Sequence, residues 1–264
     1  MKIKIFLLCF LASASAFAQQ TSRTEDFGRF FNYLFRGSYL QFTQQNNLVY
    51  GLVGGPLLWY GFKNDQSLHD KVSKQNIPNT LEFIGQNLQI IVGFPLIPLI
   101  FYQSGRANNK PHRMQFAIEY ASAMYLAYLE TMLLSYIHIH NRPSSENLSK
   151  WERVFRRDSS WPSGHVVPFA VLTFKTLQFY GPWWSLIPAT LTLVGGYQRM
   201  QSQKHFSSDI IGAILLCAWA SEGVRAAAGY GNNHPFYQRV YEGKVKVGLI
   251  HHQGVYGPKV TWQY

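Results

Sequence analysis

Six apolar stretches constrain the fold of this 264-residue chain more than any other feature. Several have helical periodicity, as where Leu126, Leu129 and Leu133 recur at three- and four-residue spacing. Polar segments with glycine and proline separate the stretches, which span residues 48–62, 86–103, 116–139, 163–180, 182–198 and 209–226. The pattern predicts an all-α fold, a helical bundle of about six core helices.

Two further segments flank these stretches. In residues 26–42, Phe27, Phe30, Phe31 and Leu34 fall on one face of a predicted helix, which is therefore amphipathic. Such a helix can lie in a membrane interface or pack on the bundle, and the sequence leaves both alternatives open. Residues 245–264 alternate apolar and polar side chains between glycines and a proline, which predicts a short C-terminal β-hairpin.

The N-terminus has the pattern of a secretory signal peptide. Lys2 and Lys4 precede an apolar run that ends in small residues at Ala16-Phe17-Ala18, so residues 1–18 are expected to be the signal. The alternative is an uncleaved membrane anchor, but the apolar run is short for a membrane span. Residues 19–264 are then expected to form one helical domain, in which the lone Cys217 is a small buried hydrophobe.

The charge balance is basic. Without Lys2 and Lys4 the chain carries 22 basic and 13 acidic side chains, a formal charge of +9. A basic balance fits nucleic acid, an anionic membrane or an anionic substrate. Because the basic residues are scattered and form no long run, nucleic acid is not expected as a partner. Lipid headgroups or phosphorylated substrates fit better.

The apolar stretches do not make a clear membrane domain. Several have only 15–18 residues, with internal proline or glycine, whereas a span needs about 20 apolar residues. If the six stretches crossed a membrane, Lys and Arg would be divided about equally between the loops on its two sides, so no positive-inside bias appears. Mean hydropathy is only −0.10. These features favour an exported, periplasmic bundle that rests on a membrane surface over the alternative, an integral membrane protein.

Three polar islands interrupt the apolar pattern. They are HNRP at 140–143, WPSGH at 161–165 and YQRMQSQKHFSSD at 197–209. The first follows the third stretch, and the second opens the fourth. The turn at Gly181-Pro182 makes the fourth and fifth stretches antiparallel, so the fifth delivers the third island to the same end of the bundle. The three islands are therefore expected to meet.

The second island has the residues of an anion site. Ser163 can cap a helix, and the helix N-terminus attracts phosphate through its amide groups and its dipole. Gly164 lets the backbone approach a bound group, because glycine has no Cβ. His165 then lies beside that group. A plain helix cap is the alternative interpretation of this tetrapeptide.

The third island adds a histidine–carboxylate pair. His205 and Asp209 are four residues apart, which places them on one face if the segment is helical. Asp209 can then fix the tautomer of His205 and leave the other ring nitrogen as a nucleophile. Arg199 offers a planar guanidinium that suits phosphate oxygens.

Together the islands resemble the superfamily of type 2 phosphatidic acid phosphatases, class A acid phosphatases and vanadium haloperoxidases. The pattern of that superfamily is K-x6-R-P, then P-S-G-H, then S-R-x5-H-x3-D. The chain has Arg142-Pro143, then Pro162 to His165, then Arg199, His205 and Asp209 at the matching spacings. The resemblance covers about residues 116–215.

Two positions depart from the superfamily pattern. Ser135 stands where the pattern has lysine, and Gln198 stands where it has serine. Loss of the lysine removes one cation from the phosphate pocket, which weakens transition-state binding unless another cation replaces it. The candidates for that replacement are Lys150, Arg156, Arg157 and Lys204.

The resemblance implies a phosphomonoester hydrolase of the cell envelope that needs no metal or other cofactor. His205 would be the nucleophile, His165 the general acid and base, and Asp209 the residue that orients His205. The phosphoryl oxygens would be held by Arg142, Arg199, Ser163 and Gly164. The substrate is either a lipid phosphate or a small organic phosphate. A catalytically impaired phosphate-binding protein and a vanadate-dependent haloperoxidase are the alternatives.

Overall fold

In the computed structural model the described residues are 20–88, 95–139, 141–144, 159–231, 234–238, 245–252 and 255–262. The predicted signal peptide, residues 1–18, lies outside them. Three of the four candidates to replace the motif lysine also lie outside them, namely Lys150, Arg156 and Arg157.

The described part of the chain is mostly helical, which confirms the predicted class for this part. The first elements are α2 (Gln20–Leu40), η2 (Gln41–Thr43), α3 (Gln45–Val72), α4 (Asn79–Phe83) and η3 (Ile84–Leu88). They are followed by α6 (Ile97–Ala107), α7 (Pro111–Ser135), α9 (Val167–Tyr180), α10 (Pro182–Gln201) and α11 (Ser207–Ala227). Two strands, β1 (Val245–His252) and β2 (Val255–Trp262), then pair antiparallel.

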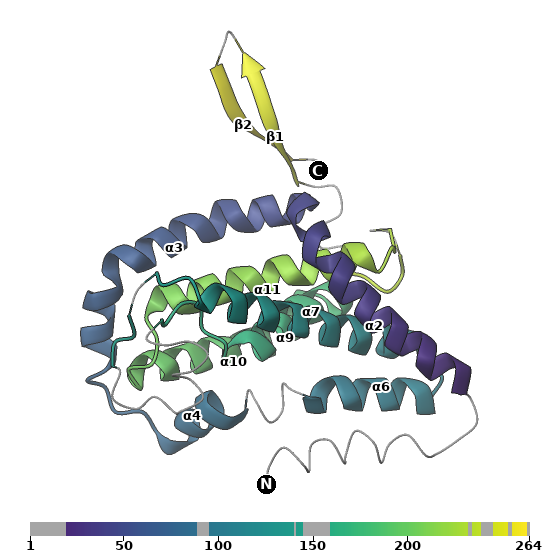
Figure 1. Cartoon of the computed structure of the whole chain (residues 1–264), viewed down its shortest axis with the longest axis horizontal. Coiled ribbons are helices and arrows are strands. Elements are labelled where there is room, and N and C mark those ends of the chain that lie inside the picture. Colours follow the sequence, from purple (N-terminus) through teal and green to yellow (C-terminus); the bar gives the residue numbers. More distant parts are fainter. Residues whose placement is uncertain are drawn as a thin grey trace.

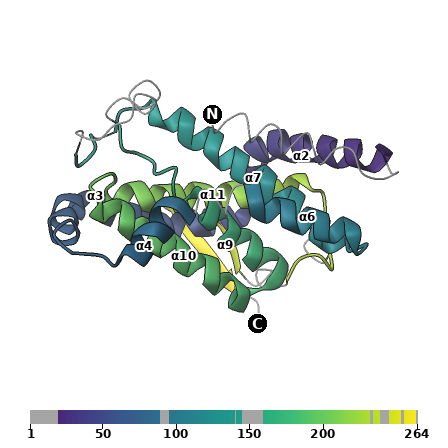
Figure 2. The same ribbon diagram turned by 90° about the horizontal axis from the view of Figure 1, so that it is seen from below.

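Helix α11 lies at the centre of the bundle. It packs against α2, α3, α7 and α9, while α10 packs on α9 and α6 packs on α7 (Figures 1 and 2). In Figure 1, α3 runs along the outer side of α11, and β1 and β2 project away from the helices. Helices α7, α9 and α10, which flank the polar islands, therefore each contact at least one other helix of this group.

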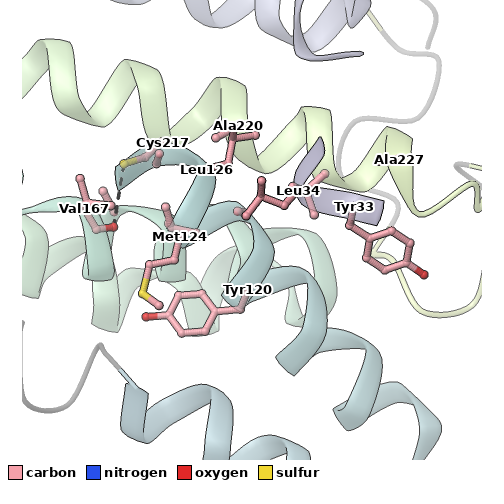
Figure 3. Close-up of a cluster of buried hydrophobic side chains, with 14 of the residues drawn as sticks. Tyr33, Leu34, Tyr120, Met124, Leu126, Val167, Cys217, Ala220 and Ala227 are labelled. Carbon is pink, nitrogen blue, oxygen red and sulfur yellow. Dashed lines mark hydrogen bonds between the residues drawn. The ribbon is translucent and has the colours of Figure 1, made fainter. Parts of the chain in front are cut away.

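The main core joins four helices. Tyr33 and Leu34 come from α2, Met124 from α7, Val167 from α9 and Cys217 from α11 (Figure 3). The Cys217 thiol lies 3.9 Å from the main-chain oxygen of Val167 and is fully buried. This confirms the prediction that Cys217 is a small buried residue. Burial raises the pKa of its thiol well above the ordinary value.

Helix α2 packs on the bundle with only part of the apolar face that the sequence indicates. Tyr33 and Leu34 are buried, and Phe30 packs against the core. Phe27 and Phe31 were expected on the same face but are exposed. The contact with α11 selects this side of α2, because Gly37 lies against the backbone of Gly223. A larger residue at either position would keep the two helices apart.

The turn between α9 and α10 has the predicted form, but the start of α9 does not. Gly181 has φ of 85°, which favours glycine, and it alone separates the two helices, which pack side by side. Helix α9 begins at Val167 and not at Ser163, and no side chain caps it. Residues 164–166 instead form a turn, and Pro168 occupies the first turn of the helix.

A buried lysine connects the central helices at the end of the bundle away from the islands. Lys175 of α9 is fully buried and lies 2.8 Å from a carboxylate oxygen of Glu119 on α7. It also donates to the side chain of Gln178 and to the main-chain oxygen of Ser221 on α11, both at 2.9 Å. Burial lowers the pKa of Lys175, and the carboxylate of Glu119 opposes this effect.

The partners of Lys175 extend this network. Glu119 accepts hydrogen bonds from Gln115 at 2.7 Å and from the hydroxyl of Tyr237 at 2.6 Å. Gln178 donates to Glu222 of α11 at 2.8 Å, and Arg225 donates to the other oxygen of Glu222 at 2.7 Å. Polar groups with such complete partners can be buried without a large desolvation penalty, and they fix how the helices are rotated.

We expect Lys175→Met to lower the free energy of unfolding by about 3 kcal/mol or more, because it leaves the buried Glu119 carboxylate without its cation. Chemical denaturation measures the change. Lys71→Met is the matched control, since Lys71 is exposed near the end of α3, and it should change the free energy by less than about 0.5 kcal/mol. Equal effects of the two substitutions would show that the network does not stabilise the fold.

Candidate functional site

The second and third islands meet at Asp209, in the first turn of α11. The main-chain N–H of Ser163 donates to the main-chain oxygen of Asp209 at 3.0 Å. The hydroxyl of Ser160 donates to Oδ1 of Asp209 at 3.2 Å. All three residues are buried. The WPSGH segment is thus attached directly to the start of α11.

Asp209 also contacts the histidine of its own island. Its Oδ2 lies 3.3 Å from Nδ1 of His205 and accepts the main-chain N–H of Phe206 at 2.7 Å. His205 precedes α11 and is not part of a helix. The two side chains therefore meet because Asp209 folds back to cap its helix, and not because they share a helical face as the spacing suggested. With the proton of His205 on Nδ1, Nε2 carries the lone pair.

Arg199 lies in the last turn of α10, and its side chain is almost fully buried. Its main-chain oxygen accepts the N–H of Lys204 at 3.1 Å and the N–H of His205 at 3.3 Å. These bonds close the loop between α10 and α11 and hold Arg199 and His205 together. Lys204, the described candidate for the missing lysine, is partly buried in this loop.

The first island joins the other two through its backbone. Asn141 and Ser159 form an isolated antiparallel bridge, and Ser160 donates to the main-chain oxygen of Asn141 at 3.5 Å. The N–H of Ser144 donates to the main-chain oxygen of Gln203 at 3.2 Å. Arg142 lies between these contacts and is buried. The structure brings all three islands to one end of the bundle, as the topology predicted.

Two hydroxyl groups beside the second island have no hydrogen-bond partner among the described residues. They are Oγ of Ser163 and Oγ1 of Thr131, and both are buried. Ser163 therefore does not cap α9. A Cβ on Gly164 would lie 3.7 Å from Cγ2 of Thr131 and closer to no other atom, so protein packing does not require glycine there. His165, in the turn before α9, is partly exposed.

Trp161 fixes the second island against α11 through a close contact. A Cβ on Gly212 would lie 2.9 Å from Cε2 of the Trp161 indole, so only glycine leaves room for this ring. Gly212 is three residues after Asp209. The same turn of α11 thus carries the carboxylate of the site and the surface on which the WPSGH segment rests.

Both departures from the motif have a structural account. Ser135, at the lysine position, is the buried last residue of α7, and its hydroxyl donates to the main-chain oxygen of Met132 at 2.6 Å. Gln198, at the serine position, packs its side chain on Gly85 of η3, where any Cβ would clash. Ser135 thus satisfies its own helix, and Gln198 supports a neighbouring element.

Sequence reasoning missed two residues that contact the site. Ser160 belongs to the second island but received no role, since a serine alone indicates no chemistry. Asp65 of α3 accepts hydrogen bonds from Ser207 and Ser208 at the start of α11. No motif includes Asp65, and it lies 142 residues from Ser207 along the chain. The described part of the chain has no group of three or more His, Cys, Asp or Glu placed to hold a metal ion.

A helical core with a buried histidine–carboxylate pair and two buried arginines defines a site that can bind and transfer an anionic group. Residues 116–227 match the family model of the PAP2 superfamily. This segment contains the three islands, and the match supports a phosphatase-type hydrolase. No curated protein and no solved structure matches the chain.

We expect Gly164→Ala to leave the melting temperature unchanged or to raise it slightly, because alanine fits there and restricts the unfolded chain. The same methyl group should lower phosphatase activity if a phosphoryl group approaches this backbone. Gly223→Ala is the contrasting variant, since a Cβ there would clash with the main-chain oxygen of Gly37 and should destabilise the fold. Thermal unfolding and initial rates give both readouts. Full activity of the Gly164 variant would contradict the expected approach.

Proposed function

We propose that this protein is a metal-independent phosphomonoester hydrolase of the cell envelope that acts through a phosphohistidine intermediate. The observation that carries the proposal is the contact of His205 Nδ1 with Asp209 Oδ2 at 3.3 Å. Asp209 also accepts the main-chain N–H of Ser163 with its main-chain oxygen. One carboxylate-bearing residue thus positions both the nucleophile and the phosphate-binding segment. The envelope location rests on the predicted signal peptide at residues 1–18.

In the first step, Nε2 of His205 attacks phosphorus, and the bond from phosphorus to the ester oxygen breaks. Asp209 accepts the hydrogen bond from Nδ1–H, keeps the ring oriented and stabilises the positive charge that develops on it. His165 gives a proton to the leaving alkoxide, which departs as the alcohol. The product of this step is phosphorylated His205.

In the second step, water attacks the phosphohistidine, and the P–N bond breaks. His165, now neutral, takes a proton from the water. Inorganic phosphate leaves, and both histidines return to their starting states. Arg142 and Arg199 supply charge and donors for the phosphoryl oxygens, with the hydroxyl of Ser163 and the amide of Gly164. The buried Ser163 hydroxyl has no partner among the described residues and supports this role.

The pocket has one cation fewer than the motif because Ser135 replaces lysine. Both arginines of the motif are present and buried, so the phosphoryl group retains two planar, charged donors. These features support turnover rather than phosphate binding alone. The alternatives, an impaired binding protein and a vanadate-dependent haloperoxidase, make opposite predictions in the assays below.

We expect His205→Gln to abolish phosphate release from every substrate, because no other group can form the covalent intermediate. His165→Asn should slow hydrolysis of alkyl phosphates by about 10²–10⁴-fold, the usual effect of losing a general acid. It should slow hydrolysis of p-nitrophenyl phosphate much less, since that leaving group departs without a proton. Initial rates, and trapping of acid-labile, base-stable phosphate on the protein, measure these effects.

His138→Asn is the matched control for these variants, because His138 is exposed beyond the end of α7. Its rates should equal those of the unmodified protein. If the unmodified protein binds phosphomonoesters but releases phosphate from none of a broad panel, it is a binding protein instead. Vanadate should inhibit phosphate release, whereas halide oxidation with peroxide and vanadate would favour the haloperoxidase alternative.

The surface of the protein supports contact with a membrane. On α2, Phe27, Phe31, Phe35 and Tyr39 form an exposed aromatic stripe at four-residue spacing, and Phe35 is 65% exposed. Other large apolar side chains are exposed on α3, α7 and α10, among them Trp183, which is 81% exposed. Within the described ranges one helix, Ser207–Ala227, has the length and composition to cross a membrane, but 61% of its 18-residue apolar window is buried.

This aromatic stripe favours a lipid phosphate over a small organic phosphate as substrate. Exposed aromatic rings insert into the headgroup boundary of a bilayer, and basic side chains beside them attract anionic lipids. Arg36 is exposed on the same helix.

We expect the double substitution Phe35→Gln and Tyr39→Gln to weaken binding to vesicles that contain an anionic lipid by about tenfold or more. Each ring contributes on the order of 1 kcal/mol when it enters the bilayer boundary. Co-sedimentation measures the binding, and Asn32→Gln on the exposed side of α2 is the control. Hydrolysis of a vesicle-borne lipid phosphate should fall in parallel, with hydrolysis of a sugar phosphate unchanged. Unchanged vesicle binding would contradict the membrane contact.

A further inference from the structure

The carboxylate of Asp65, on α3, lies at the start of α11. Its Oδ1 accepts the hydroxyl of Ser207 at 2.7 Å and the main-chain N–H of Ser208 at 3.0 Å. Its Oδ2 accepts the hydroxyl of Ser208. Asp65, Ser207 and Ser208 are all buried. A carboxylate with three donors in a buried place is held tightly, because charge-assisted hydrogen bonds are short and strong.

The approach of α3 to α11 is built for this contact. Gly61, one turn before Asp65, faces the backbone of Ser208, and a Cβ there would lie 3.2 Å from Cα and N of Ser208. One turn after Asp65, the ring of His69 packs edge-on against Phe206 with 5.7 Å between ring centres. Three successive turns of α3 therefore hold residues 206–208.

Residues 206–208 connect the two members of the histidine–carboxylate pair. The amide of His205 bonds to the main-chain oxygen of Arg199, and the amide of Phe206 bonds to Oδ2 of Asp209. The amide of Ser208 bonds to Asp65. Two carboxylates thus hold alternate amides of the first turn of α11. Asp209 belongs to this turn, but Asp65 belongs to another helix. Its carboxylate therefore prevents the turn from moving as a unit relative to α3.

We propose that Asp65 is a positioning residue for His205, acting through Ser207 and Ser208 on the first turn of α11. This role rests on the proposed function, in which His205 is the nucleophile. It places α3, which precedes the segment that matches the PAP2 superfamily, within the machinery of the site. Asp65 does not touch the phosphoryl group in this proposal. It fixes the direction in which the His205 side chain leaves the backbone.

The size of the effect follows from the geometry of attack. An in-line attack tolerates little displacement, and a shift of about 1 Å in a reacting group costs on the order of 10²-fold in rate. Loss of one oxygen and the charge of Asp65 releases the first turn without removing any group that binds phosphate. The maximal rate should therefore fall more than the apparent affinity for substrate.

The test uses the full chain with Asp65→Asn, Ser208→Ala and the two combined. Asp70→Asn is the matched control, since Asp70 lies on the same helix, is exposed and accepts a hydrogen bond from the side chain of Gln66 at 2.9 Å. Ser208→Ala is the milder variant and keeps the test usable if Asp65→Asn folds poorly. Each variant is compared per folded molecule, as measured by circular dichroism and thermal unfolding.

Two measurements are made on these proteins. The first is amide hydrogen exchange of residues 206–211, which reports the anchoring and does not depend on activity. The second is the single-turnover rate of phosphohistidine formation together with kcat and KM. We expect Asp65→Asn to speed exchange at this turn about tenfold or more and to lower kcat about 10–100-fold, with KM changed less than about threefold. Asp70→Asn should change neither.

The double variant should lose little more than Asp65→Asn alone, because both substitutions break the same contact. Unchanged exchange in Asp65→Asn would overturn the anchoring. Faster exchange with an unchanged rate of phosphohistidine formation would show that Asp65 only caps α11, and would overturn the positioning role. If the unmodified protein forms no phosphohistidine, the proposed function fails, and the catalytic role of Asp65 fails with it. The hydrogen-exchange result would still show whether Asp65 anchors the first turn of α11.

Discussion

The ion pair between Lys175 and Glu119 fixes the central helices on which the rest of the structure depends. A buried charge is costly unless it is paired and hydrogen-bonded, so these contacts restrict how α7, α9 and α11 rotate relative to one another. Helices behave as rigid rods over this length. The end of the bundle that holds Lys175 therefore determines where the opposite ends of the same helices lie, and those ends carry the three islands.

At the island end, backbone contacts centre on the start of α11. Asp209 binds the amide of Phe206 with its side chain and the amide of Ser163 with its main-chain oxygen. The loop from Arg199 closes on His205 in the same region. Short loops form the site, and main-chain amides in these loops bond to oxygen atoms of residues on α10 and α11. The helices therefore hold the loops in place. The exposed aromatic stripe on α2 is a separate feature, for which membrane contact is proposed.

The sequence predicted the parts of the fold and the site that depend on local spacing. The helical class, the turn at Gly181 and the meeting of the three islands follow from periodicity and connection length, and the structure agrees with them. The start of α9 was predicted wrongly, because the contact of Trp161 with Gly212 decides it. The side of α2 that packs on the bundle was left open by the sequence, and the contact of Gly37 with Gly223 decides it. Asp65 was missed for the same reason. Its partners are distant in sequence, and no periodicity reports a contact between helices.

The anchoring of α11 by α3 has a consequence for the order in which the chain folds. The two partners are separated by 142 residues, and closing so long a loop is slow and entropically unfavourable until other contacts bring its ends together. During synthesis α3 emerges early and α11 late, so the first turn of α11 cannot be completed before most of the chain exists. The core can therefore form before Asp65 reaches the first turn of α11, and the anchoring of that turn is expected late in folding.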